Sequence, residues 1–104
     1  MIINIQVLEH LARIAMSGRF DFDVHRDFKN AYMPLLDQPA VREIELEMSK
    51  IDYLDSAALG MLMLLHERAK DANKPVALLN ASHEALRVME VANFSRIFPM
   101  RNGR

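Results

Sequence analysis

The sequence predicts an α/β fold: one small mixed β-sheet with helices mainly on one face. Two observations carry this prediction. Several short segments alternate apolar with polar residues, which is the period of a half-buried strand. Longer segments between them repeat apolar residues every three or four positions, as a helix facing a core does. The 104 residues, 51% hydrophobic and 26% charged, suit a single domain spanning 1–104.

The first part of the chain is expected to form an antiparallel hairpin. Apolar residues alternate with polar ones over residues 3–7, and a second alternating row follows over residues 11–16. A turn through Glu9 and His10 would join the two strands, although this pair lacks the glycine of the best two-residue turns. Gly18 is expected to end the second strand in a turn.

A first helix is predicted over residues 24–35, where apolar residues follow the helical period. Asp21 or Asp23 is its candidate N-cap, because a carboxylate there can accept an unpaired backbone N–H. Pro34 lies inside the pattern. Since proline removes a helical hydrogen bond and crowds the preceding turn, the helix is expected to end or kink near Met33.

Residues 41–48 form the clearest strand in the sequence. Their even-numbered positions from 44 onward are apolar, whereas Glu43, Glu45 and Glu47 occupy the other face. Three carboxylates in a row can hardly be buried without partners. One face of the sheet is therefore expected to be at least partly open to water.

The second half of the chain is predicted to form a helix–strand–helix series. A helix over residues 55–71 leads to a short buried strand over 76–79, so the preceding strand completes a βαβ unit with parallel strands and a right-handed crossover. Ser82 would cap a third helix, which Asn93 would close in a left-handed conformation. The apolar residues of 94–100 are expected to pack back on the core.

Composition limits the classes of function. The net charge is −1 with acidic and basic residues interspersed, which argues against nucleic acid as the main partner. The absence of cysteine excludes disulfides and thiolate metal sites. The densest apolar run, residues 57–65, is far shorter than the roughly 20 residues of a membrane span, and the first residues lack the pattern of a signal peptide. The protein is expected to be soluble and cytoplasmic, without membrane insertion.

The junction before the second helix holds the candidate site. Asp55 and Ser56 stand where four backbone N–H groups lack helical partners. On spacing alone, helix capping by either side chain explains the pair, and such a cap is worth roughly 1 kcal/mol. The alternative is phosphorylation of Ser56, because phosphate oxygens would meet free N–H groups and the positive end of the helix dipole.

The helix that follows is unusually apolar, with Gly60 interrupting the run over residues 57–65. Such a helix is either buried on several sides or leaves one stripe exposed for a partner. Ala57 with Met61 or Met63 would form that stripe, since methionine suits adaptable binding surfaces.

An enzyme is not expected. A serine hydrolase would need a base beside Ser56, but the chain has no Gly-x-Ser-x-Gly elbow and no histidine at a suitable spacing. The four histidines also lack metal-ligand spacing. With three glycines and no phosphate-binding loop, nucleotide binding has little support, and neither a metal nor a cofactor is expected.

The segment 44–60, IELEMSKIDYLDSAALG, resembles the signature of STAS domains, the fold of bacterial anti-sigma factor antagonists. In that family a strand leads into an Asp-Ser pair, and a small-small-Leu-Gly run opens the next helix. Residues 17–21 resemble the family's glycine and aspartate after the second strand. Residues 93–98 resemble its closing element.

The resemblance implies partner switching. In such antagonists the serine matching Ser56 is phosphorylated by an anti-sigma factor that is also an ATP-dependent serine kinase. The unmodified form binds that partner, and a separate serine phosphatase removes the phosphate. The expected partner surface comprises residues around the strand ends and the start of the helix: Asp21, Asp52, Asp55, Ser56, Ala57, Ala58, Gly60, Met61 and Met63.

Some positions depart from the family's pattern. Ala58 and Asn93 replace usual glycines, Glu47 stands where aspartate is common, and a long final helix is missing or reduced. A second function is compatible with the same fold: a non-enzymatic STAS subunit that clamps the ATPase of a membrane transport complex of the ABC lipid-transport type. The Asp55-Ser56 pair favours the phosphorylation switch, although a transport subunit could carry the pair by descent.

Overall fold

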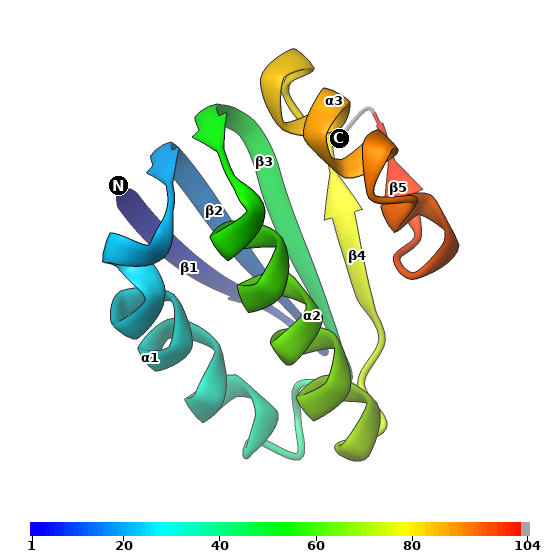
Figure 1. Cartoon of the computed structure of the whole chain (residues 1–104). Helices are drawn as coiled ribbons and strands as arrows, with labels where there is room; N and C mark the ends of the chain where they lie inside the picture. Colours follow the sequence, from blue (N-terminus) through cyan, green and yellow to red (C-terminus); the bar gives the residue numbers. More distant parts are fainter. Residues whose placement is uncertain (103–104) are drawn as a thin grey trace.

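The computed structural model describes residues 1–102, which form a five-stranded sheet in the order β1-β2-β3-β4-β5 (Figure 1). β1 runs antiparallel to β2, whereas β2 to β5 are parallel to one another, so the predicted mixed α/β sheet is confirmed. The elements in chain order are β1 (Ile2–Leu8), β2 (Leu11–Phe20), η1 (Phe22–Val24), α1 (His25–Leu36), β3 (Glu43–Leu54), α2 (Ser56–Asp71), β4 (Val76–Leu79), α3 (His83–Val91), η2 (Phe94–Arg96) and β5 (Met100–Arg101).

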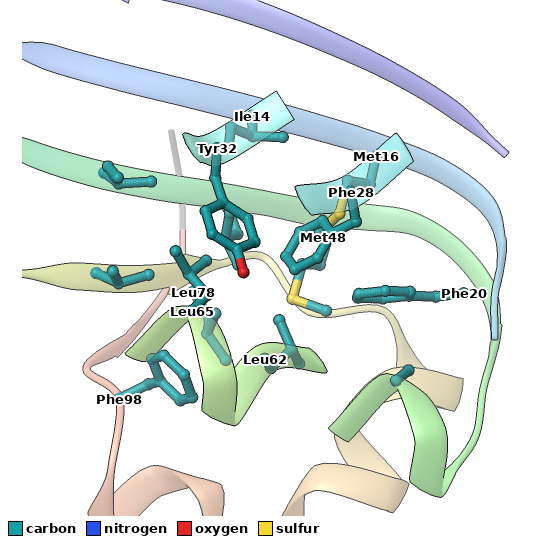
Figure 2. Close-up of a cluster of buried hydrophobic side chains, with 14 of the residues drawn as sticks. Ile14, Met16, Phe20, Phe28, Tyr32, Met48, Leu62, Leu65, Leu78 and Phe98 are labelled. Atoms are coloured by element: carbon teal, nitrogen blue, oxygen red, sulfur yellow. The ribbon is translucent and has the colours of Figure 1, made fainter. Parts of the chain in front are cut away.

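The core lies between the sheet and the helices. Figure 1 shows α1 and α2 side by side on the same face of the sheet. The apolar faces of β2, β3 and β4 point toward these helices, and Figure 2 shows Leu62 and Leu65 of α2 meeting Met48 and Leu78 there. α3 joins the same core through buried residues, so one continuous core holds the layers together.

The opposite face of the sheet holds a buried carboxylate. Glu45 is only 1% exposed, and its Oε1 accepts hydrogen bonds from Arg13 Nε and Nη2 at 3.1 and 2.8 Å. Arg101 Nη1 lies 3.6 Å from the other carboxylate oxygen. Glu43 stays exposed. The expectation that these carboxylates need partners is therefore met, but side chains of the sheet itself, rather than water, surround Glu45.

Glu47 is held on the same face by hydrogen bonds. Its carboxylate accepts the Ser49 N–H at 2.7 Å and the Asn80 Nδ2 at 2.8 Å. Partial burial raises the pKa of Glu47, but the hydrogen bonds from Ser49 and Asn80, together with the charge of Arg13, outweigh it and leave the pKa below its usual value.

The prediction that Gly18 ends the second strand is wrong. β2 continues to Phe20, and its register against β3 shifts between Gly18 and Arg19. Gly18 has a φ of +105°, which glycine adopts without the penalty of a side chain. The extra residue of this irregularity lies on β3, where Asp52 has no partner between Ile51 and Tyr53, so β2 continues past Gly18 rather than ending there.

Pro34 does not end the first helix near Met33, because α1 runs on to Leu36. A proline in the last turn removes only the hydrogen bond that its own nitrogen would have made. The free carbonyls of that turn find other donors: the Asp37 and Gln38 N–H groups bond the carbonyls of Pro34 and Leu35, at 3.2 and 3.3 Å.

Some apolar residues are more exposed than the sequence pattern indicates. β1 is an edge strand on which Ile3 alone is half-buried, because α1 reaches no farther across the sheet. In α3, the apolar residue Val91 is 86% exposed. The closing apolar segment packs back as predicted through Phe94 and Phe98, and it adds the short strand β5, which the sequence did not predict.

The boundaries of α3 follow the sequence closely, whereas those of β3 do not. Asn93 closes α3 with a φ of +59°, and Ser82 Oγ accepts the Ala85 N–H at 3.2 Å, so both predicted ends of this helix are confirmed. β3 extends to Leu54, beyond the predicted end of the strand, and meets α2 directly. Within residues 1–102, no helix combines the length and the apolar character needed to cross a bilayer.

Candidate functional site

At the junction between β3 and α2, the two polar side chains have different roles. Asp55 is the N-cap of α2, with extended backbone, and its Oδ1 accepts the Ala58 N–H at 3.0 Å. Ser56 follows as the first helical residue, with its side chain exposed. Its hydroxyl makes no hydrogen bond within residues 1–102. The capping interpretation is therefore correct for Asp55 and wrong for Ser56.

The start of α2 leaves backbone donors near this free hydroxyl. The N–H groups of Ser56 and Ala57 precede the first intrahelical hydrogen bond, which the Leu59 N–H makes to the Asp55 carbonyl at 3.2 Å. The first turn contains no acidic residue. A negatively charged group on Ser56 would therefore meet two backbone donors and the positive end of the helix dipole.

A groove of about 530 Å³ opens beside Ser56, between the start of α2 and α3. Its walls are mostly apolar. It is lined from β3 and α2 by Asp52, Tyr53, Leu54, Ser56 and Leu59, and from α3 by Glu84, Arg87, Val88, Val91 and Ala92.

The charged side chains of this Ser56 groove are all exposed. Asp52 and Glu84 are acidic, whereas Arg87 is the one cation in the lining. The balance is one negative charge. A phosphate on Ser56 would add about −1.5 to −2 at neutral pH and would make the groove strongly anionic.

A second groove, of about 350 Å³, lies on the other side of α2, against α1. Two large apolar side chains, Phe22 and Leu64, are exposed at this α1–α2 groove. Gly60 is exposed on α2 between Ser56 and Leu64. The complete lining is Phe22, His25, Lys29, Tyr32, Ala57, Gly60, Met61 and Leu64.

The structure separates the predicted partner-binding residues into groups. Asp52 and Ser56 line the Ser56 groove, whereas Ala57, Gly60 and Met61 line the α1–α2 groove. The others line neither groove. Ala58 is fully buried against the core and offers no side-chain surface, Met63 is half-buried, and Asp55 is occupied as the helix cap.

Asp21 reaches the site through two residues that sequence reasoning missed. Its Oδ2 accepts a hydrogen bond from Arg19 Nε at 3.2 Å, and the Arg19 guanidinium lies 3.8 Å from the centre of the Tyr53 ring. The hydrogen bond to Asp21 raises the pKa of Arg19 above its usual value. Tyr53 lines the Ser56 groove, so Asp21 is connected to one wall of that groove through Arg19.

The sequence also did not predict that α3 forms one side of the Ser56 groove. The sequence pattern of α3 is that of a short amphipathic helix, in which Glu84, Arg87 and Val91 are not distinguished from other positions. The local sequence does not show which of them face a helix that is distant in the chain. No three histidine, aspartate or glutamate side chains within residues 1–102 are grouped as a metal site requires. The arrangement therefore places an exposed hydroxyl in one groove beside α2, with a second groove on the other side of the helix.

Comparison with known proteins agrees with this architecture. The family described as "Mlab, STAS domain" matches residues 3–100. A STAS-domain-containing protein of Pseudomonas aeruginosa (strain UCBPP-PA14) is 39% identical over 85 residues, which cover 82% of each chain.

Two solved structures of SpoIIAA have the same fold. The anti-sigma factor antagonist SpoIIAA in its unphosphorylated form superposes with a TM-score of 0.84 at 16% identity, covering 99% of this chain and 89% of the other. The Bacillus cell fate determinant SpoIIAA in its phosphorylated form gives 0.77 at 16% identity, covering 99% and 92%. From its sequence and its fold together, the chain belongs to the STAS domain family.

Proposed function

We propose that this protein is an anti-sigma factor antagonist that works by partner switching in the cytoplasm and is not itself an enzyme. Unphosphorylated, it binds an anti-sigma factor with serine kinase activity. Phosphorylation of Ser56 releases that partner, and a serine phosphatase restores the binding form. One observation carries the proposal: the Ser56 hydroxyl is exposed at the start of α2 and free of the capping role, which Asp55 performs.

The position of Ser56 suits a modification that leaves the fold intact. Because Asp55 caps the helix, a kinase can phosphorylate the Ser56 hydroxyl without removing a hydrogen bond that stabilises α2. The phosphate would add negative charge where the helix N-terminus tolerates it. The modification would therefore act on the surface rather than on the core.

The surroundings of Ser56 explain why a phosphate would weaken binding. In the unmodified form, the two grooves beside α2 offer apolar side chains to a partner. Asp52 and Glu84 already make the Ser56 groove acidic. A phosphate beside them would repel an acidic partner surface and would have to be desolvated in an apolar contact.

Several similar proteins are described as anti-sigma factor antagonists, which supports this function. The solved structures with the same fold include SpoIIAA, an anti-sigma factor antagonist described in both an unphosphorylated and a phosphorylated form. The Asp55-Ser56 junction of this chain presents a hydroxyl that the same chemistry could use.

The direct test is to incubate the purified protein with ATP and each candidate anti-sigma kinase, and to locate phosphate by mass spectrometry. We expect phosphate on Ser56. Ser56→Ala should abolish it and keep kinase binding, with folding stability within about 0.5 kcal/mol of wild type. Ser56→Asp should weaken binding about tenfold or more. Ser95→Ala, which changes another exposed serine, is the control and should behave as wild type. Phosphate on a different residue, or equal binding by the alanine and aspartate variants, would contradict the proposal.

Gly60 gives a second test, with two readouts of opposite sign. Beyond its chain neighbours and the backbone of its own helix, a Cβ added at Gly60 would meet nothing within 4 Å, so packing does not require a glycine there. Gly60→Ala should stabilise the fold by about 1 kcal/mol and raise Tm by about 4–8 °C, because glycine is a poor residue inside a helix. If a partner packs closely over α2, the added methyl group should weaken that binding. A variant with higher Tm and unchanged kinase binding would remove Gly60 from the partner surface.

A further inference from the structure

The edge strand β1 has none of the features that usually protect a sheet edge. Its seven residues, Ile2–Leu8, include no charged residue and no proline, and its pairing with β2 contains no bulge. Ile5 and Val7 are 46% and 49% exposed. The free side of β1 is therefore an open template for another strand.

The turn at Glu9 and His10 determines which backbone groups are free. Leu8 pairs with Leu11 across this two-residue turn, and such flanking residues exchange hydrogen bonds. Backbone groups alternate in direction along an antiparallel strand. Even-numbered residues of β1 therefore bond β2, whereas Ile3, Ile5 and Val7 point their N–H and C=O groups away from the sheet.

From this geometry we infer that β1 pairs in antiparallel orientation with β1 of a second copy of this chain, about a two-fold axis at Ile5. In that register Ile5 faces Ile5 of the second copy, and Ile3 faces Val7. Three hydrogen-bonded pairs with two bonds each would give about six main-chain bonds across the edge. The two sheets would join into one.

The strand is complementary to itself in this register. On the helix-covered face every pair is apolar, and on the other face Asn4 meets Gln6 and Ile2 meets Leu8. Amide pairs with amide, apolar with apolar, and no like charges meet. The nearest alternative registers that keep each side chain on the same face of the sheet are shifted by two residues in either direction. One of them pairs Ile2 with Gln6, and the other pairs Asn4 with Leu8. The centred register is the one that pairs all seven residues, so a second copy is the fitting occupant.

This contact would leave the proposed switch free. No residue of β1 lines the Ser56 groove or the α1–α2 groove. A dimer formed through β1 would carry both of these surfaces on each copy. The inference is independent of the proposed function, because it concerns a different edge of the molecule and its test needs no kinase.

Disulfide trapping tests the register, since the natural chain contains no cysteine. In an antiparallel hydrogen-bonded pair the Cα atoms lie about 5.5 Å apart, within the range that a disulfide spans. Under mild oxidation, Ile5→Cys should give a covalent dimer. Gln6→Cys is the matched control: its two copies would be diagonal, about 7–8 Å apart, and should cross-link poorly. Equal cross-linking of both variants would overturn the register.

Sedimentation tests the dimer itself. Wild type should be dimeric at about 100 μM, a concentration at which homodimers with micromolar dissociation constants are assembled. Ile5→Lys and Ile5→Glu should each be monomeric, because like charges would face each other, and an equimolar mixture should dimerise again. Gln6→Lys, which sets lysine opposite a neutral residue, should stay dimeric. A wild type that stays monomeric would overturn the inference, even if it binds a strand of another protein, and so would a dimeric Ile5→Lys variant.

Discussion

Replacing Leu62 with alanine is expected to lower the free energy of unfolding by about 2–5 kcal/mol, whereas the same change at Leu64 should lower it by less than about 1 kcal/mol. Leu62 is 0% exposed and points from α2 into the core (Figure 2), so its loss leaves a cavity. Leu64 lies two residues farther along the same helix and is 46% exposed. Urea denaturation of the two variants measures the difference.

Partner binding should show the reverse order. Leu64 lines the α1–α2 groove and contributes apolar surface to it. Leu64→Ala should therefore weaken binding to the proposed kinase by about tenfold, the effect of losing roughly 1.4 kcal/mol of apolar contact. Leu62→Ala, measured at a temperature where it is folded, should bind almost as wild type. Equal losses of stability in the two variants would contradict the packing of α2, and unchanged binding by Leu64→Ala would exclude this groove from the partner surface.

Lys74 is expected to be the most important charged residue for stability. Its side chain is buried, and its Nζ donates to the carbonyls of Leu35, Leu36 and Gln38 at 2.9, 2.8 and 2.7 Å. The carbonyls of Leu35 and Leu36 lie in the last turn of α1 and that of Gln38 follows it, so the ammonium meets the negative end of the helix dipole. It is the donor to the Leu36 carbonyl and adds a second bond to the other two carbonyls, which also accept backbone N–H groups. The contact ties the end of α1 to the turn between α2 and β4.

Lys74→Met should lower the free energy of unfolding by about 3 kcal/mol and Tm by roughly 10–25 °C, since methionine keeps the length but removes the charged donor from all three carbonyls. The carbonyls of Leu35 and Gln38 keep backbone donors, whereas that of Leu36 would lose the donor it has. Lys70→Met is the matched control. It makes the same chemical change at an exposed position of α2 and should shift Tm by less than a few degrees. Differential scanning calorimetry of both variants decides the question. Similar melting temperatures would mean that water replaces the ammonium at little cost.

The local sequence pattern was sufficient to predict much of the architecture. The buried faces of β2 and β3, the strand β4 and the span of α2 follow from periodicity, because side chains at fixed spacing must share a face. The caps at Ser82 and Asn93 follow from residue chemistry that acts over three or four positions. The family resemblance then connected the Asp55-Ser56 pair with a switch, which periodicity could not do.

Other features depended on residues far apart in the chain. β2 continues past Gly18 because it pairs with β3, which carries an extra residue, Asp52, at this point of the register. The burial of Glu45 requires Arg13 and Arg101, which come from two other strands. Likewise, no local signal distinguishes Ile5, left exposed at the sheet edge, from an equivalent residue covered by a helix.

For the site, the sequence by itself determined that a serine and an aspartate stand at the start of an apolar helix. Only the tertiary structure decided that Asp55 caps the helix while Ser56 stays free, and that α3 supplies the far wall of the groove. The physical reason is the range of the interactions. A repeating pattern shows which side chains share a face, but what covers that face depends on the packing of distant elements, which a local pattern does not contain.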